Sequence, residues 1–244
     1  QKKVSIIGNA LLELLFPNCC VSCEGKLLGE EEVICADCIA SIARTEHAML
    51  EQNGVDILFA ELIQQDKLRL RYEGGAAFAY YNRERGRFLR KMIEQGKFGA
   101  HPYSDVFYRL GCLAAQEYID ADIFDDVDYL VPVPLHPRRM HERGFNQAEE
   151  ICKGMSDVLH IPVDTQHLVR VRNNPHQSRS EFQRRKDNVK DLFEIRYPEE
   201  WKNKHIVLVD DVITSGATMM ACMRKMTPIR GCRIGVFALG WAHK

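Results

Sequence analysis

The sequence contains no apolar run that approaches the roughly 20 residues needed to cross a membrane as a helix. The apolar stretch at positions 4–16 includes Glu13 and lacks a small-residue cleavage site, so a signal peptide is not expected. The formal net charge is only −1 at pH 7, which excludes a global field that attracts nucleic acid. These absences predict a soluble, cytoplasmic protein. Its 244 residues suffice for one α/β core and a small extra module.

The sequence also lacks the Gly-Lys-Ser/Thr triplet of a Walker phosphate loop. It has a different candidate phosphate site near its C-terminus. Positions 206–209 form a short, β-branched apolar run, which is typical of a strand buried on both faces of a parallel sheet. Asp210 and Asp211 follow directly. Small and hydroxyl-bearing residues come next, and a helix is predicted at 219–226.

A loop in this position lies at the carboxyl end of the sheet, where open α/β folds bind ligands. Its N–H groups, its hydroxyls and the positive end of the next helix would hold a phosphate, and a side chain at Gly216 is expected to fill that cradle. Ionised carboxylates only accept hydrogen bonds and therefore suit the vicinal hydroxyls of a ribose. The pattern predicts a ribose 5-phosphate site, with the hydroxyls on Asp210 and Asp211 and the phosphate on Thr214, Ser215, Gly216, Ala217 and Thr218. The alternative is an ordinary strand end followed by a helix cap.

The N-terminal region holds a cysteine-rich segment, CCVSCEGKLLGEEEVICADC, at positions 19–38. Two C-x2-C pairs can each grip one side of a tetrahedral ion, and four thiolates select zinc first. Cys19 or Cys20 could be the first ligand, and Cys20 gives two matched pairs. Disulfides and an iron–sulfur cluster are the alternatives. We therefore predict a structural Zn²⁺ site formed by Cys20, Cys23, Cys35 and Cys38.

Two stretches resemble known family motifs. VLVDDVITSGAT at 207–218 resembles the motif of type I phosphoribosyltransferases for 5-phospho-α-D-ribose 1-diphosphate (PRPP), and VPVPLHPRRMHERGFNQA at 131–148 resembles the signature of the ComF family. ComF proteins are linked to natural competence and DNA uptake. The resemblance covers the cysteine-rich segment and positions 72–244.

The resemblance implies an α/β fold, with a type I phosphoribosyltransferase-like parallel sheet flanked by helices. A small N-terminal four-Cys zinc-ribbon module would precede it. The expected domains are 1–50 for the ribbon with a helical lead-in and 51–244 for the phosphoribosyltransferase-like part. A hood over the acceptor base is expected at about 66–120.

Two further loops are implied by the resemblance. The pyrophosphate loop would contain Pro134, Leu135, His136, Arg138 and Arg139, and arginine suits pyrophosphate because it gives forked donors to phosphate oxygens. The basic stretch 168–190 would include a flexible loop at about 173–188 that closes over PRPP. Its candidate catalytic residues, which match the family pattern, are Gln177, Arg185 and Asn188. Ser180 departs from that pattern, because an apolar residue is expected at its position.

The remaining pattern predicts strands at 72–81, 129–134 and 168–171 and helices at 83–94, 103–118 and 147–159. Positions 96–99 and 134–139 are expected to be loops. Asn146 is a good helix cap. For Asn146 and for Gln147, a structural role and a functional role are equally open. Lys97 either faces the site or is an ordinary surface lysine.

Two functions remain open on the sequence. The first is an enzyme, a glycosyltransferase that holds PRPP with Mg²⁺ while a nitrogen nucleophile attacks C1 of the ribose and pyrophosphate leaves. The second is a non-catalytic protein of the natural transformation machinery. It would sense PRPP, or use its zinc ribbon and basic segments to bind single-stranded DNA beside DNA-uptake proteins.

Overall fold

The computed structural model describes residues 18–29, 32–98, 103–171 and 192–242. The apolar stretch at 4–16 and the basic loop with Gln177, Arg185 and Asn188 lie outside these ranges, so the expectations for them stay predictions. None of the helices in the described ranges is long and apolar enough to cross a membrane.

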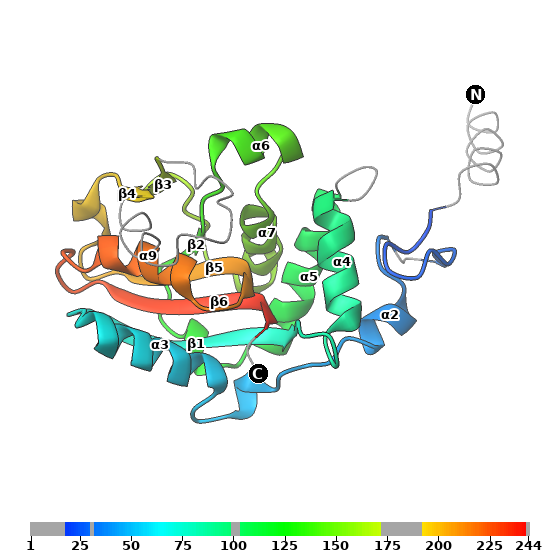
Figure 1. Cartoon of the computed structure of the whole chain (residues 1–244), viewed down its shortest axis with the longest axis horizontal. Helices are drawn as coiled ribbons and strands as arrows, with labels where there is room; N and C mark the ends of the chain where they lie inside the picture. The colour runs from blue at the N-terminus through cyan, green and yellow to red at the C-terminus, as the bar shows by residue number, and fades with distance from the viewer. Residues whose placement is uncertain (1–17, 30–31, 99–102, 172–191, 243–244) are drawn as a thin grey trace, which may run out of the picture.

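A four-stranded sheet in the order β1-β6-β5-β2 forms the centre of the molecule (Figure 1). The strands are β1 (Arg71–Tyr80), β2 (Tyr129–Pro132), β5 (His205–Ile213) and β6 (Arg233–Trp241). All three strand pairs are parallel. A parallel sheet requires helical crossovers and cover on both faces, which explains the uninterrupted apolar run of β5.

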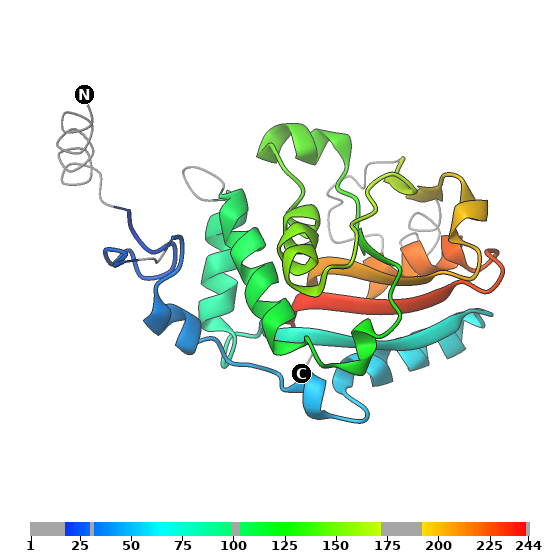
Figure 2. The same cartoon turned by 180° about the vertical axis from the view of Figure 1, so that it is seen from behind.

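Helices cover each face of the sheet. On one face α4 (Arg87–Phe98), α5 (Ser104–Glu117) and α7 (Gln147–Leu159) pack against Phe78, Val207 and Phe237. The other face is covered by α3 (Gly54–Asp66) and α9 (Ala217–Met226), which enclose Ile206 and Leu208. Figure 1 shows α3 running along β1, and Figure 2 shows α5 beside α7 from the opposite side. The sheet is therefore the middle layer of three.

The chain changes direction across the sheet between β2 and β5. After β2 it passes through α7 and returns outside β2, where Val163 forms a parallel bridge to Leu130. After β5 it passes through α9 and returns on the other side as β6. This reversal leaves a crevice beyond the carboxyl ends of β2 and β5, the place where open α/β sheets bind ligands.

The cysteine-rich segment and α2 (Ala36–Ala40) pack against the α4–α5 face. Leu27, Ile34 and Ile42 are buried in the same apolar cluster as that face. Arg44 forms an ion pair with Glu117, with Nε 2.7 Å from Oε2. The connection then follows β1, since the Tyr80 N–H donates to the Ala43 carbonyl over 2.9 Å.

The smaller elements surround the carboxyl end of the sheet and its edges. They are the antiparallel pair β3 (Leu168–Arg170) and β4 (Phe193–Ile195), the helix α6 (Pro137–Arg143), and the 3-10 turns η1 (His47–Met49), η2 (Asp122–Phe124) and η3 (Pro198–Trp201).

Several predicted elements differ from the structure. The strand predicted at 206–209 extends to Ile213, so the two acids lie within β5. The predicted loop at 96–99 is wrong for Gly96, Lys97 and Phe98, which belong to the last turn of α4. The predicted loop at 134–139 is helical from Pro137, because proline is favoured in a first helical turn and His136 caps it. The strand predicted at 72–81 is β1, an edge strand of the main sheet. The boundary near residue 50 stays a prediction.

Candidate functional site

A cleft of about 350 Å³ lies at the crevice between β2 and β5. It combines residues from segments that are far apart in the sequence: the last turn of α4, the β2–α6 connection, β3, and the end of β5 with the start of α9. Most of its polar lining is charged or hydroxyl-bearing. The polar and charged members are Tyr81, Lys97, Arg139, Arg143, Gln147, Arg170, Asp210, Asp211, Thr214 and Thr218.

The two acids enter the cleft from neighbouring positions on β5. Asp211 is buried and its carboxylate forms an ion pair with the Lys97 ammonium. Asp210 lies beside it, and its Oδ1 accepts the N–H of Asp211 over 2.8 Å. The structure therefore places both predicted carboxylates at one cleft. Their contact with a ribose stays a prediction.

Burial sets the protonation of this cluster. It raises the pKa of Asp210 to about 6, although Lys97 and then Arg170 act in the opposite direction. Burial likewise lowers the pKa of Lys97 to about 8, which Asp210 opposes and Arg143 and Arg139 reinforce. At neutral pH the site therefore holds the Asp210 carboxylate and the Lys97 ammonium together.

The phosphate loop is only partly in the cleft. Thr214 and Thr218 line it. Ser215 and Ala217 are exposed and do not belong to the lining.

The expectation that a side chain at Gly216 would fill the cradle is wrong. Gly216 has a φ of 70° and precedes α9. A Cβ there would point at α3, 3.0 Å from Leu62 Cδ1 and 3.3 Å from Phe59 Cζ. The glycine is thus required for the left-handed turn and for close packing on α3.

The predicted pyrophosphate loop contributes one arginine to the cleft. Pro134, Leu135 and Arg139 line it, whereas His136 and Arg138 do not. His136 instead caps α6, since its Nδ1 accepts the Arg138 N–H over 3.1 Å. No residue from 134 to 139 has a positive φ.

The structure adds residues that sequence reasoning did not assign. Arg143 at the end of α6 donates to Gln147 Oε1 and lies 5.3 Å from the centre of the Phe98 ring. Arg170 reaches the cleft from β3, and Lys97, left undecided on the sequence, reaches it from α4. One signal existed for Lys97: the helical spacing of Leu89, Met92, Ile93 and Gly96 continues to it.

The predicted metal site is assembled in the structure. Cys20, Cys23, Cys35 and Cys38 bring their Sγ atoms within 4.8 Å of one another, and Cys19 is not a member. The Cys23 and Cys35 sulfurs are 3.7 Å apart, close to the separation of roughly 3.8 Å that Zn–S bonds of 2.3 Å give in a tetrahedron.

Backbone donors favour the thiolate of Cys20, whereas burial raises the pKa of Cys38 to about 12. The N–H groups of Ser22 and Cys35 each point to Cys20 Sγ over 3.4 Å. Burial raises the pKa of Cys20, but these bonds outweigh it and bring the pKa down to about 7. A structural zinc fits the four sulfurs because it binds deprotonated thiols.

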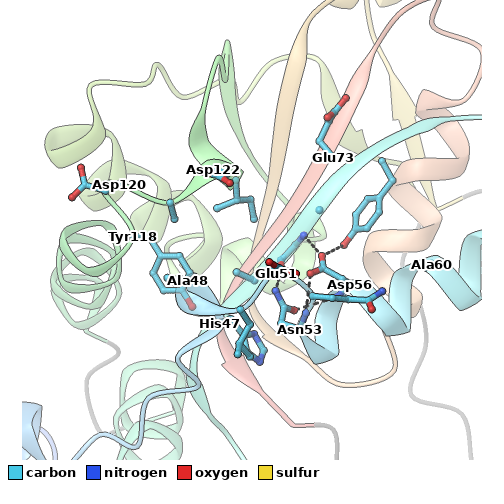
Figure 3. A pocket seen from close by; sticks show the side chains of 18 residues that line it. His47, Ala48, Glu51, Asn53, Asp56, Ala60, Glu73, Tyr118, Asp120 and Asp122 are labelled. Atoms are coloured by element: carbon cyan, nitrogen blue, oxygen red, sulfur yellow. Dashed lines mark hydrogen bonds between the residues drawn. The ribbon is translucent and has the colours of Figure 1, made fainter.

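A larger hollow of about 550 Å³ lies beside β1, away from this cleft (Figure 3). Asp56, which lines it, accepts the Gly75 N–H over 2.7 Å and the Asn53 N–H over 3.1 Å. The Gly75 bond fastens the start of α3 to β1, and the Asn53 bond completes the N-terminal cap of α3. The hollow contains none of the predicted site residues, so we locate the functional site at the smaller cleft.

Residues 146–240 match the family model of the phosphoribosyl transferase domain. The chain is 38% identical over 134 residues to the DNA utilization protein YhgH of Escherichia coli K12, covering 54% of this chain and 57% of the relative. It is 34% identical over 91 residues to competence protein F of Haemophilus influenzae, covering 37% of this chain and 40% of the relative. Competence protein ComFC of Bacillus subtilis is 31% identical over 90 residues, with 37% and 34% covered.

The chain resembles the ComF family, and the named relatives together with the matched domain support its membership. Its fold is the expected one, a type I phosphoribosyltransferase-like parallel sheet flanked by helices with a four-Cys cluster before it. The matched segment spans about half the length of the first of these ComF relatives, 57%.

Two of the solved structures that are similar to this chain are enzymes. One is an allosteric regulatory enzyme of purine biosynthesis, with 17% identity, a TM-score of 0.39, and coverage of 59% of this chain and 29% of that one. The other is the hypoxanthine-guanine phosphoribosyl transferase of L. donovani, with 15% identity, a TM-score of 0.34, and coverage of 55% and 67%.

The pKa of Asp210 predicts a pH-dependent stability for this protein. Its ordinary value is 3.8 and its value in the fold is about 6, so the folded state binds this proton more tightly than the unfolded state. The resulting stability is present below about pH 4 and is lost as the pH rises through about 6. Asp210→Asn, which mimics the protonated form, should be more stable than wild type at pH 8 by at most about 3 kcal/mol.

Denaturant unfolding at a series of pH values measures this difference. We expect the advantage of Asp210→Asn to shrink between about pH 6 and pH 4. A difference that stays constant from pH 8 to pH 4 would contradict the raised pKa.

Proposed function

We propose that the chain binds PRPP in the cleft between β2 and β5. The observation that supports this most is the meeting of both acids, Thr214, Thr218 and Arg139 in one cleft. The acids and the threonines lie within the match to the phosphoribosyl transferase domain, residues 146–240. The acids would accept the ribose hydroxyls, since ionised carboxylates offer only acceptors. The 214–218 loop and the start of α9 would hold the 5-phosphate.

The pyrophosphate end of PRPP would lie toward the β2–α6 connection. Arg139 is the arginine of the predicted loop that faces the cleft, and Arg170 faces it from β3. Guanidinium groups would bind the pyrophosphate oxygens and stabilise their charge as the bond to C1 breaks. Mg²⁺ would arrive with PRPP and supply further neutralisation. The protein's part is then positioning and electrostatics, with no nucleophilic side chain of its own.

The cysteine cluster, we propose, holds one structural zinc, and the protein acts in the cytoplasm. Gln177, Arg185 and Asn188 complete the proposed site, although they lie outside the described residues.

Arg139 and Arg138 provide a matched test of the pyrophosphate assignment. Arg139→Ala should weaken binding of PRPP and of pyrophosphate about tenfold, because it removes a charged donor from the cleft. Arg138→Ala removes the same charge from the neighbouring exposed position and should change affinity less than about twofold. Calorimetric titration of both variants measures this. Equal losses in the two variants would count against the assignment.

A second candidate function is binding of single-stranded DNA. The relatives named for DNA utilization and competence favour it, as do Arg138 on α6 and the exposed ring of Phe98 near the cleft. Basic groups neutralise phosphates and aromatic rings stack with bases.

Two assays on the same preparation separate the candidates. An enzyme releases pyrophosphate from PRPP when supplied with an acceptor base. A DNA-binding protein retains oligonucleotides with an affinity that falls steeply as salt rises. Release of pyrophosphate supports the transferase, and tight salt-dependent DNA binding without release supports the alternative.

A further inference from the structure

Lys97 occupies an unusual place for a helix-terminal lysine. It lies in the last turn of α4, yet its side chain is only 16% exposed and its ammonium forms an ion pair with Asp211, whose side chain is 8% exposed. This ion pair joins the helical layer to the end of β5. Phe98, the next residue, contacts Arg143 on the far wall of the cleft. The last turn of α4 thus reaches both walls.

The cleft presents an electrostatic conflict that this ion pair can resolve. The proposed ligand carries a phosphate, and the loop that would hold it begins three residues after Asp211. A buried carboxylate without a counter-ion repels a phosphate several ångströms away. At an effective dielectric constant near 20, this repulsion weakens phosphate binding by about tenfold or more. The diol of the ribose nevertheless requires carboxylate acceptors.

We propose that Lys97 is the positioning residue that lets the acid pair and the phosphate loop act on one ribose phosphate. Its ammonium offsets the charge of Asp211 and holds that carboxylate in the cleft while the diol and the phosphate bind. This role rests on the proposed function, and it assigns to α4 a part in ligand binding.

Two small probes separate the two halves of the ligand. Inorganic phosphate tests the phosphate loop alone, and ribose 5-phosphate tests the loop together with the diol. Lys97→Met should weaken binding of both by about tenfold or more, because Asp211 is then an unneutralised charge. Adding Asp211→Asn to Lys97→Met should restore phosphate affinity to within about threefold of wild type. Binding of ribose 5-phosphate should stay weak, because the carboxylate acceptor is gone.

Two controls accompany these variants. Lys97→Arg keeps the charge and should bind both probes within about threefold of wild type. Lys91→Met removes the same charge from an exposed position of the same helix and should bind like wild type. Thermal unfolding of each variant verifies that it is folded before titration.

The outcomes are distinct. Tighter binding of ribose 5-phosphate by Lys97→Met would mean that Lys97 blocks the site, and it would overturn the proposal. Failure of Asp211→Asn to restore phosphate binding would mean that Lys97 does not act by neutralising Asp211, and it would also overturn the proposal. Wild-type affinity in Lys97→Met refutes the Lys97 role alone. A wild-type protein that binds neither the probes nor PRPP refutes the proposed function, and the role of Lys97 with it.

Discussion

Cys35→Ser should release the zinc and unfold the cysteine-rich module. A single hydroxyl cannot replace a thiolate ligand, and so small a module depends on its metal for folding. Elemental analysis should find about one zinc per wild-type chain and far less than one in the variant. The rest of the protein should stay folded and keep its ligand affinity, because the cleft draws no residue from the module. The Tm should fall, since Leu27 and Ile34 would leave the apolar cluster that they share with α4 and α5.

Cys19→Ser is the matched control for this prediction. Cys19 is the immediate neighbour of Cys20 but does not belong to the cluster, so the variant should keep its zinc and its Tm. Loss of zinc from Cys19→Ser, or a fully folded module in wild type purified without metal, would contradict the four-cysteine assignment.

Asp211→Asn should have the second large effect, a loss of ribose affinity. The substitution keeps the size of the side chain but removes the charge and turns one acceptor into a donor. A lost charged hydrogen bond costs on the order of 1.5–3 kcal/mol, which is roughly tenfold to a hundredfold in affinity for PRPP or ribose 5-phosphate. Calorimetric titration with either ligand measures the loss.

Asp128→Asn provides the control for Asp211→Asn. Asp128 pairs with Lys204 over 2.8 Å at the opposite end of β5, so the variant loses an ion pair, a more exposed one, away from the cleft. It should bind PRPP as wild type does. A similar loss in both variants would point to a general effect on β5 rather than to a contact with ribose.

The parts of the fold that follow from the sequence are those with strong local signals. The spacing of apolar residues and the Asn146 cap define α7 at 147–159, and the structure has the same bounds. The β-branched run at 206–209 identifies a doubly covered strand. The two C-x2-C pairs predict the cysteine cluster, because this spacing by itself lets both sulfurs of a pair bind the same metal ion.

The parts that the sequence could not provide depend on long-range packing. Lys97 faces the acid pair because α4 packs against the same sheet face as α5 and α7. The helical spacing places Lys97 on the buried side of α4 but does not report its partner. Gly216 looks like a phosphate-loop glycine, yet the space that it leaves is filled by α3. Arg143 and Arg170 reach the cleft from elements whose placement follows only from the assembled fold. Tertiary packing therefore determines which basic residues face the site.

Titration of the wild-type protein with PRPP and Mg²⁺ tests the central claim most directly. We expect one binding site per chain, competition by ribose 5-phosphate, and no binding when Asp211→Asn and Asp210→Asn are combined. An absence of binding by wild type, or equal binding by the double variant, would contradict the assignment of the cleft between β2 and β5 as a PRPP site.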